Sequence, residues 1–327
     1  MQLSMNNDDN QSGSGVRKAT IPEDRDGQRI DNFLIGQLKG VPKSLIYRIL
    51  RTGQVRINGK RAKPDARLSG GDTVRIPPVR AAEVGSDKVA PSALVERIRR
   101  SVIFEDRDFL VIDKPAGIAS HGGSGVAFGA IELLRAARPD ETLELAHRLD
   151  RDTSGVLVLT RRRAALTALQ ELIRDGHITK QYLALLSGRP ARARFDVNVP
   201  LRKFDLHGGE RMVRVSDDGK PALTAFKIIG NHADASFAEV TLYTGRTHQI
   251  RVHAQHAGHP LAGDEKYGLR DFNKAMRDFG LRRLFLHAAR FEFDLDGKTH
   301  SFSAPLAADL AAVLDALPPA TGGKTAR

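Results

Sequence analysis

Two acidic residues, Asp150 and Asp152, lie in a short polar segment between two apolar stretches, and either could serve as a catalytic carboxylate. The segment covers residues 147–155 and reads HRLDRDTSG. Reactive groups often lie on a loop that a rigid scaffold holds in place. However, Asp, Thr, Ser and Gly also build ordinary turns. The spacing therefore predicts a catalytic loop or a structural turn, and it does not choose between the two aspartates.

A second polar cluster, residues 244–253, contains two arginines that could bind an acidic group. It reads TGRTHQIRVH, with Arg246 and Arg251. The positions of Ile250 and Arg251 fit a short helix that Thr247 would open. Because a guanidinium group can bind a carboxylate or a phosphate through two hydrogen bonds, we expect one of these ligands for each arginine.

The histidines of this region suggest a different chemistry, that of a metal site. Its four members are His248, His253, His256 and His259. No carboxylate follows before Asp264, and the arginines between the histidines would repel a cation. We therefore expect these histidines to be exposed or hydrogen-bonded in the core, and we predict no bound metal.

Tyr182 follows Lys180 and Gln181 at the start of an apolar stretch, and it is one of only four tyrosines. It could pack in the interior of a sheet or offer an aromatic face to a ligand. Elsewhere, the glycine-rich residues 122–125 lack the Lys-Ser/Thr that a phosphate loop requires. No dinucleotide fingerprint and no GxSxG elbow occur, which argues against nucleotide-dependent enzymes and hydrolases of those classes.

The elements that must position these clusters come in adjacent strand pairs. Such pairs, rather than regular alternation of strand and helix, predict an α+β fold with a mostly antiparallel sheet. We expect this domain over residues 100–317. The expected strands are 102–104, 109–112, 143–149, 156–160, 182–186, 222–229, 238–243, 284–286 and 291–295, and the expected helices are 127–137, 165–173 and 306–317.

A smaller module precedes this domain and carries most of the net charge of +12. Between residues 25 and 80 there are 13 basic and 4 acidic residues. Apolar spacing predicts helices at 30–38 and 45–50, with strands at 55–57 and 73–76 around a turn at Asn58–Gly59. Such a dense basic patch favours a polyanion, most often nucleic acid. The candidate RNA-binding residues are Lys43, Arg48, Arg51, Arg56, Lys60 and Arg61.

Composition also sets the boundaries and excludes several classes of protein. We expect a disordered tail at 1–24, the module at 25–85, a linker or bridging helix at 86–99 and a basic tail at 318–327. The chain has no cysteine, which excludes disulfides and thiolate chemistry. No charge-free apolar run approaches the ~20 residues of a membrane span, and the N-terminus does not resemble a signal peptide. We therefore expect a cytoplasmic protein without a membrane partner.

Four motifs together resemble the RluA-type pseudouridine synthases, in the order that this family has. They are DKPAGIASHGG (113–123), HRLDRDTSGVLVLTR (147–161), KQYLAL (180–185) and GRTHQIRVHAQHAGHPLAGDEKYG (245–268). Residues 209–221 are most similar to the RluC-like subtype, which modifies several uridines of bacterial 23S ribosomal RNA. The basic module resembles the small RNA-binding domain named after ribosomal protein S-four.

The resemblance implies a role for single residues. Asp150 would be the catalytic aspartate, as nucleophile or as base, and Arg251 would pair with it. Tyr182 would pack against the uracil ring, and Arg148 would hold the RNA as the uridine flips out. The isomerisation involves no net redox change, so the resemblance implies no cofactor and no metal.

The implied function is therefore isomerisation of specific 23S rRNA uridines by a monomeric enzyme of the cytoplasm. One alternative is a related enzyme that acts on other rRNA uridines or on tRNA. A second, from another class, is a non-catalytic RNA-binding factor of ribosome assembly. The module alone would support that last reading, whereas the complete set of Asp150, Tyr182 and Arg251 argues against it.

Overall fold

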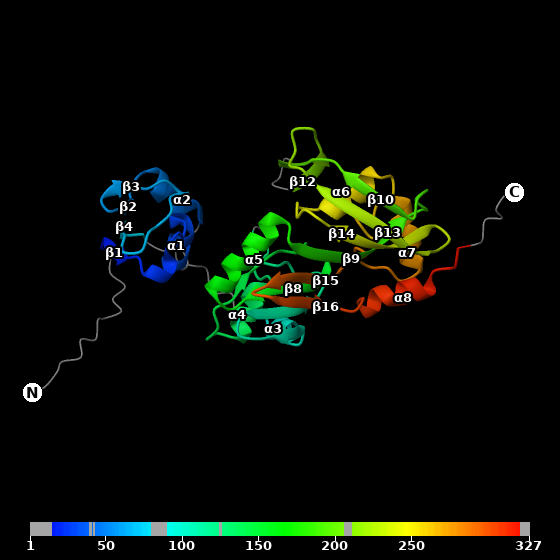
Figure 1. Ribbon diagram of the computed structural model, residues 1–327, viewed down its shortest axis with the longest axis horizontal. Coiled ribbons are helices and arrows are strands. Elements are labelled where there is room, and N and C mark those ends of the chain that lie inside the picture. Colours follow the sequence, from blue (N-terminus) through cyan, green and yellow to red (C-terminus); the bar gives the residue numbers. More distant parts are fainter. Residues whose placement is uncertain are drawn as a thin grey trace, which may run out of the picture. The chain divides into compact units, whose positions relative to one another are not determined.

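The computed structural model describes residues 15–38, 41, 43–79, 90–123, 126–205 and 211–320. The chain divides into two compact units between Val89 and Ala90 (Figure 1). The first unit carries the basic module, and the second carries all three motif clusters. Ser124, Gly125 and Glu210 lie outside the described residues.

The first unit is a four-stranded antiparallel sheet with two α-helices. Its strand order is β1-β4-β2-β3. Apolar residues of both helices and of β4 are buried together, as the predicted spacing requires. The elements are β1 (Arg17–Thr20), the 3-10 helix η1 (Glu23–Arg25), α1 (Ile30–Gln37), α2 (Lys43–Arg51), β2 (Arg56–Ile57), β3 (Lys60–Arg61) and β4 (Thr73–Ile76).

The predicted disordered tail at 1–24 is wrong for its last residues. Residues 17–20 form β1 and pair with β4 from Thr73 to Ile76. Ile21, which follows β1, is 1% exposed and belongs to the core. Residues 17–20 are mostly polar and therefore show no strand pattern in the sequence. As an edge strand, β1 is stabilised by main-chain pairing with β4 and by one buried residue beside it, Ile21. Residues 1–14 lie outside the described residues.

The second unit is built on a ten-stranded sheet. Its main path has the order β10-β13-β14-β9-β15-β8-β6-β5, while β16 pairs with β15 and β7 with β8. The helices are α3 (Ser92–Arg99), α4 (Ala130–Ala137), α5 (Arg163–Asp175), α6 (Gln249–His256), α7 (Arg270–Asp278) and α8 (Ala308–Ala316). The strands are β5 (Val102–Glu105), β6 (Phe109–Lys114), β7 (Glu144–Leu145), β8 (Ser154–Thr160), β9 (Ile178–Ser187), β10 (Arg194–Asn198), β11 (Leu201–Asp205), β12 (Arg211–Val215), β13 (Leu223–Asn231), β14 (Ala235–Leu242), β15 (Leu286–Leu295) and β16 (Lys298–Ser303).

The middle of this sheet contains a parallel contact, between β8 and β15, whereas the other strand pairs described are antiparallel. Gly155 in β8 pairs with Ala288 in β15. A Cβ atom on Gly155 would lie 2.2 Å from the Ala288 carbonyl oxygen, and its φ of +108° suits glycine alone. Glycine at this position therefore lets the chain leave the polar loop 147–153 directly into the centre of the sheet.

Several predicted boundaries change. Of the strand expected at 143–149, only Glu144–Leu145 pairs as β7, and the rest belongs to a loop. The strands expected at 284–286 and 291–295 form one strand, β15. In the second unit the prediction missed four strands and one helix, and short or polar strands of this kind show little alternation of apolar and polar residues. They are β10, β11, β12, β16 and α7.

Both ends of the second unit also differ from the predicted boundaries. Residues 92–99, for which we expected a linker or a bridging helix, form the helix α3, and Ile98 is fully buried in the core of this unit. At the other end, the Ala233 amide donates to the Pro318 carbonyl oxygen. Residues 318–320 therefore lie against the fold, and the remainder of the predicted basic tail lies outside the described residues.

The longest helix in the described part of the chain is α5, with 13 residues. At 1.5 Å per residue it spans about 20 Å, less than the ~30 Å of a bilayer's hydrocarbon core. None of the helices in these segments could cross a membrane.

Candidate active site

The loop that carries Asp150 is hydrogen-bonded to the segment 114–120. The Ser120 hydroxyl donates to the Leu149 carbonyl oxygen and accepts from the Leu149 amide, both at 2.8 Å. The Gly117 amide donates to the Arg151 carbonyl oxygen at 2.9 Å. Main-chain contacts on both sides of Asp150 therefore fix where its side chain begins.

Lys114 ties the same two segments together from the interior. It is fully buried, and its Nζ donates to the carbonyl oxygens of Pro115, Ile118 and Arg151 at 3.0, 2.7 and 3.2 Å. Burial lowers the pKa of Lys114 to about 7. Because three donated bonds require three N–H groups, this arrangement uses the protonated amine.

The Asp150 carboxylate forms an ion pair with an arginine of the neighbouring helix. Nη1 of Arg251, on α6, lies 3.3 Å from Oδ2 of Asp150. The other two nitrogens of Arg251 bind the Asp264 carboxylate at 2.7 and 2.8 Å. One arginine thus bridges a half-buried carboxylate at the pocket and a fully buried one behind it. The pairing expected between Asp150 and Arg251 is present.

Asp264 is the anchor of this arrangement. Its burial would raise its pKa, but the hydrogen bonds from Arg251 and from the amides of Tyr267 and Lys266 outweigh burial and lower that pKa. A carboxylate that stays ionised in the interior keeps Arg251 in one orientation. The Arg251 guanidinium also lies over the Tyr267 ring, 5.0 Å from its centroid.

His248 also faces Asp150, with Nε2 3.8 Å from Oδ2, the same oxygen that Arg251 contacts. The Tyr267 hydroxyl accepts from the Val213 amide at 3.0 Å and lies 2.9 Å from Nδ1 of His248. The hydroxyl hydrogen can be donated to Nδ1, and neutral His248 with that bond carries its hydrogen on Nε2, toward Asp150. Burial lowers the pKa of His248, which favours this neutral form.

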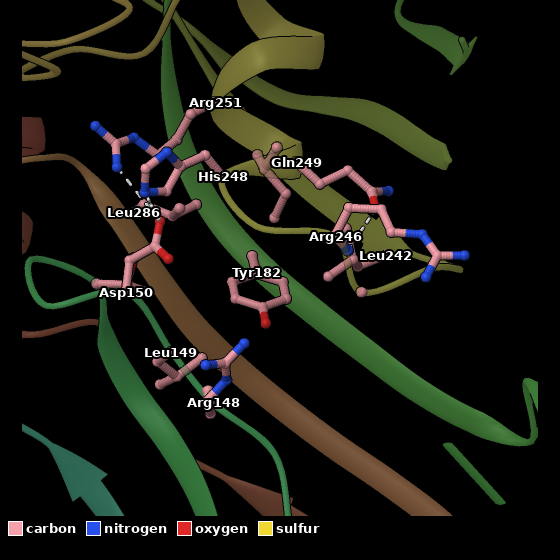
Figure 2. Close-up of a pocket in the computed structure, with 13 residues that line it drawn as sticks. Arg148, Leu149, Asp150, Tyr182, Leu242, Arg246, His248, Gln249, Arg251 and Leu286 are labelled. Atoms are coloured by element: carbon pink, nitrogen blue, oxygen red, sulfur yellow. Dashed lines mark hydrogen bonds and ion pairs between the residues drawn. The ribbon is translucent and has the colours of Figure 1, made fainter. Parts of the chain in front are cut away.

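Tyr182 projects from β9 into the middle of the pocket (Figure 2). It is 7% exposed, and burial together with nearby Asp150 raises the pKa of its phenol. Figure 2 shows Asp150 and Arg251 on one side of the ring and Arg246 on the other. The apolar side chains of Leu149, Leu242, Ile250 and Leu286 complete the lining. An aromatic face beside a carboxylate and a guanidinium can hold a flat polar ring against the reacting group.

A buried glutamine shapes the arginine-rich side of the pocket. Oε1 of Gln249 accepts from the Arg246 amide and the Thr244 hydroxyl, and Nε2 donates to the Leu223 carbonyl oxygen and the Thr224 hydroxyl. These bonds hold the turn before α6. Thr247 does not cap this helix as we predicted, because His248 occupies the N-cap position with a positive φ of 53°.

Asp152 occupies a different position from Asp150. Its Oδ1 accepts from Nε of Arg151, and its side chain is 46% exposed, against 28% for Asp150. Asp150 lies where the Tyr182 pocket and two adjoining hollows meet. The geometry therefore favours Asp150, which the residue types alone did not.

Arg148 also lines the pocket, beside Tyr182 and Arg246. Its side chain is exposed, and within the described residues it makes no hydrogen bond or ion pair with another side chain. It is thus available to a ligand at the pocket mouth.

Three of the histidines considered for a metal site, His248, His253 and His259, contact separate partners. His253 lies 2.9 Å from the Thr224 hydroxyl and 3.2 Å from the Val199 carbonyl oxygen. His259 is hydrogen-bonded to the Ser187 carbonyl oxygen. Across the described ranges, no three His, Asp or Glu side chains group as metal ligands would.

In the first unit, the predicted RNA-binding side chains that the structure describes are all exposed. They are Arg48, Arg51, Arg56, Lys60 and Arg61. Arg61 donates to the Arg51 carbonyl oxygen, so the end of α2 and the strand β3 lie together. Lys43 begins α2, but its side chain lies outside the described part.

Sequence reasoning assigned no role to four residues that organise the site: Lys114, Ser120, Asp264 and Tyr267. Each lies inside a motif that we quoted, so the motifs contained the signal. Their roles depend on contacts across 13 to 54 residues of sequence, such as Val213 with Tyr267 and Arg251 with Asp264. Spacing along the chain cannot show such contacts.

Comparison with known families matches residues 108–256 to the RNA pseudouridylate synthases and residues 28–74 to the S4 domain. The first match includes Asp150, Tyr182 and Arg251. A solved human structure, RNA Pseudouridylate Synthase Domain Containing 1, is 26% identical, has a TM-score of 0.57 and covers 69% of this chain and 90% of its own. Another, Domain Containing 4, is 23% identical with a TM-score of 0.58 over 70% and 98%, and shows the fold alone.

The chain belongs to the RNA pseudouridine synthase family and carries an S4 domain before the catalytic unit. Among curated proteins, it is 50% identical to "Ribosomal large subunit pseudouridine synthase C" of Haemophilus influenzae, over 93% of this chain and 96% of that protein. It is 52% identical to the protein of that name from Escherichia coli K12, over 86% and 90%. The expected family, the α+β fold and the enzyme class are thereby confirmed.

Proposed function

We propose that this enzyme converts specific uridines of 23S ribosomal RNA to pseudouridine, with Asp150 as the catalytic residue. The observation that carries the proposal is the single pocket in which Asp150, Arg251 and Tyr182 meet. The names of the relatives, which refer to the large ribosomal subunit, support the RNA substrate. The S4 domain supports binding to a large RNA.

The reaction needs one group at the ribose and a surface for the turning ring. The bond between uracil N1 and ribose C1′ breaks, the ring turns, and a bond forms between C5 and C1′. C5 loses a proton and N1 gains one, so uridine and pseudouridine have the same composition. The Asp150 carboxylate would act at the ribose, as nucleophile or as base.

The pocket supplies what the intermediate stages require. Arg251 would hold the Asp150 carboxylate in one orientation, because Asp264 fixes the other two guanidinium nitrogens. The Tyr182 ring would stack on the uracil while it turns, a contact worth ~1–3 kcal/mol per base. This contact would offset part of the few kcal/mol needed to flip a base out of folded RNA. Arg148 would bind the RNA at the pocket mouth.

One copy of the chain supplies Asp150, Arg251 and Tyr182 to one pocket, and we propose that a monomer is the active form. We place its action in the cytoplasm, together with ribosomal RNA. The exposed cations of the S4 domain would contact phosphates and add affinity rather than base specificity.

The test is to incubate the purified protein with protein-free bacterial 23S rRNA and to map pseudouridines by carbodiimide-blocked primer extension. We expect new stops at a few uridines with the wild type and with Asp152→Asn, the matched control. Asp150→Asn should lower the rate by about 10⁴-fold or more while RNA binding persists. Stops that persist with Asp150→Asn would contradict the catalytic role. RNA binding without any stops would contradict the 23S rRNA substrate.

A further inference from the structure

A buried lysine beside the pocket has no partner that explains it. Lys180 lies on β9, two residues before Tyr182, and both side chains are on the buried face of the strand. Lys180 is 8% exposed. In the described part of the chain, no hydrogen bond or ion pair to its amine is found. Because a buried charge without a partner is costly, its retention points to a ligand that supplies one.

The surroundings of Lys180 are strongly cationic. It lines a hollow that continues from the Tyr182 pocket, together with Arg148, Arg151 and Arg246. Asp150 is the carboxylate of that wall among the described residues, and it is engaged by Arg251. A hollow with several cations and one occupied carboxylate fits an anion.

The neighbouring histidine carries no charge and does not bind this amine. Nε2 of His147 accepts from the Val158 amide at 3.1 Å, so His147 is a neutral acceptor and its ring stacks on Phe291. Burial and the nearby Lys180 charge lower the pKa of His147 to about 3. Burial also lowers the pKa of Lys180, an effect that a bound anion would reverse.

We infer that Lys180 binds a backbone phosphate of the RNA substrate, next to the uridine that stacks on Tyr182. Residues i and i+2 of a strand are ~7 Å apart, so the amine lies within about one nucleotide of the aromatic ring. The inference deepens the proposed function and rests on it for the identity of the RNA. It assigns a phosphate subsite to a residue of the sheet itself, inside the catalytic unit.

The first test compares the stability of Lys180→Met with its RNA binding. Met has a similar length and no charge, so it removes the buried cation without leaving a hole. We expect the melting temperature of the free protein to rise by about 2 °C or more. Binding to protein-free 23S rRNA should weaken about tenfold. Lys227→Met, at a partly exposed lysine of β13 that pairs with Glu239, is the matched control and should change neither.

The second test identifies the phosphate. A short stem-loop with the mapped uridine is made with a neutral methylphosphonate at the 5′ or the 3′ flanking phosphate. One of the two should weaken binding by the wild type about tenfold and leave binding by Lys180→Met unchanged. The inference is overturned if both proteins lose the same factor, or if Lys180→Met lowers the melting temperature and leaves affinity unchanged.

These outcomes are separate from failure of the proposed function. If the wild type binds 23S rRNA and forms no pseudouridine there, the substrate is wrong, and the affinity and stability of Lys180→Met still test the phosphate site. If pseudouridine forms and Lys180→Met binds as the wild type does, only the phosphate site is wrong.

Discussion

Each unit contains a buried aspartate that holds an arginine by the same two nitrogens. In the first unit, Asp31 accepts from Nε and Nη2 of Arg29 at 3.1 and 2.6 Å. In the second, Asp264 accepts from Nε and Nη2 of Arg251 at 2.7 and 2.8 Å. Both pairs are bidentate, and both aspartates are nearly inaccessible to solvent. By local geometry alone, the two pairs are equivalent.

The two pairs differ in the surroundings of the third guanidinium nitrogen, Nη1. The Arg29 side chain is 44% exposed. The Asp31 carboxylate accepts further hydrogen bonds from the Tyr47 hydroxyl and the Asn32 amide. The Arg251 side chain is 11% exposed, and its Nη1 reaches Asp150 at the pocket. An aspartate–arginine pair by itself therefore supports a fold. We propose that it supports catalysis when the remaining donor is directed at a second carboxylate in a cavity.

Among the variants that test this comparison, we expect a large effect on the reaction rate from Arg251→Lys. A lysine ammonium cannot bind Asp264 through two parallel bonds and still reach Asp150 in the same plane. We expect the single-turnover rate of pseudouridine formation to fall about 10²-fold, with RNA affinity changed little. The measurement is a rapid-quench time course on 23S rRNA with excess enzyme. A rate equal to that of the wild type would show that the charge suffices without the bidentate geometry.

The second effect concerns the exposed cations of the first unit. Removing residues 1–89 should weaken binding to 23S rRNA about tenfold or more, since several phosphate contacts are lost. The chemical step with saturating enzyme should change less than the affinity. The affinity and the single-turnover rate, measured over a range of salt concentrations, separate the two. Equal turnover on full-length RNA with and without the module would refute its role in substrate binding.

The third effect is a loss of stability between pH 6.5 and 5 that only the second unit should show. All eleven histidines of the chain lie after residue 120, so the first unit contains none. The pKa of His147 is lowered to about 3 in the folded protein, against an ordinary value of 6.5. As the pH falls below 6.5, the unfolded chain therefore binds a proton that the folded chain does not, and stability decreases.

This difference predicts a loss of roughly 2 kcal/mol in the unfolding free energy of the second unit between pH 6.5 and 5. Urea unfolding at several pH values, with hydrogen exchange to separate the units, measures it. His147→Phe keeps a ring against Phe291 and should remove that part of the slope. An equal loss in the first unit would show that the acid response has another origin.

The sequence indicated the residues that line the pocket better than the residues that hold them in place. The polar segment 147–155, the aromatic Tyr182 and the arginine of the 244–253 cluster were all visible as unusual residue types near apolar strands. Asp150 and Asp152 could not be distinguished by spacing, because their difference is one of exposure and of Arg251 beside only one of them. The charge of the first unit predicted a polyanion as its partner, and the resemblance to a known family predicted the S4 domain.

What the sequence could not show depends on distant pairing. Asp264 and Tyr267 are ordinary residues until the fold places them against Arg251, His248 and Val213. The strand β1 was missed because its residues are polar and its stability comes from β4. In each case the missing information is a partner elsewhere in the chain.

The most direct test of the account compares Asp264→Asn with Asp31→Asn in single-turnover reactions on 23S rRNA. An asparagine cannot neutralise the arginine that either aspartate holds. We predict that Asp264→Asn slows pseudouridine formation by about 10²-fold or more, because Arg251 no longer presents Nη1 to Asp150. Asp31→Asn should lower the melting temperature of the first unit and leave the rate with saturating enzyme within about twofold. If both variants slow the chemical step equally, or if Asp264→Asn reacts as the wild type does, the claim that Asp264 supports catalysis through Arg251 is wrong.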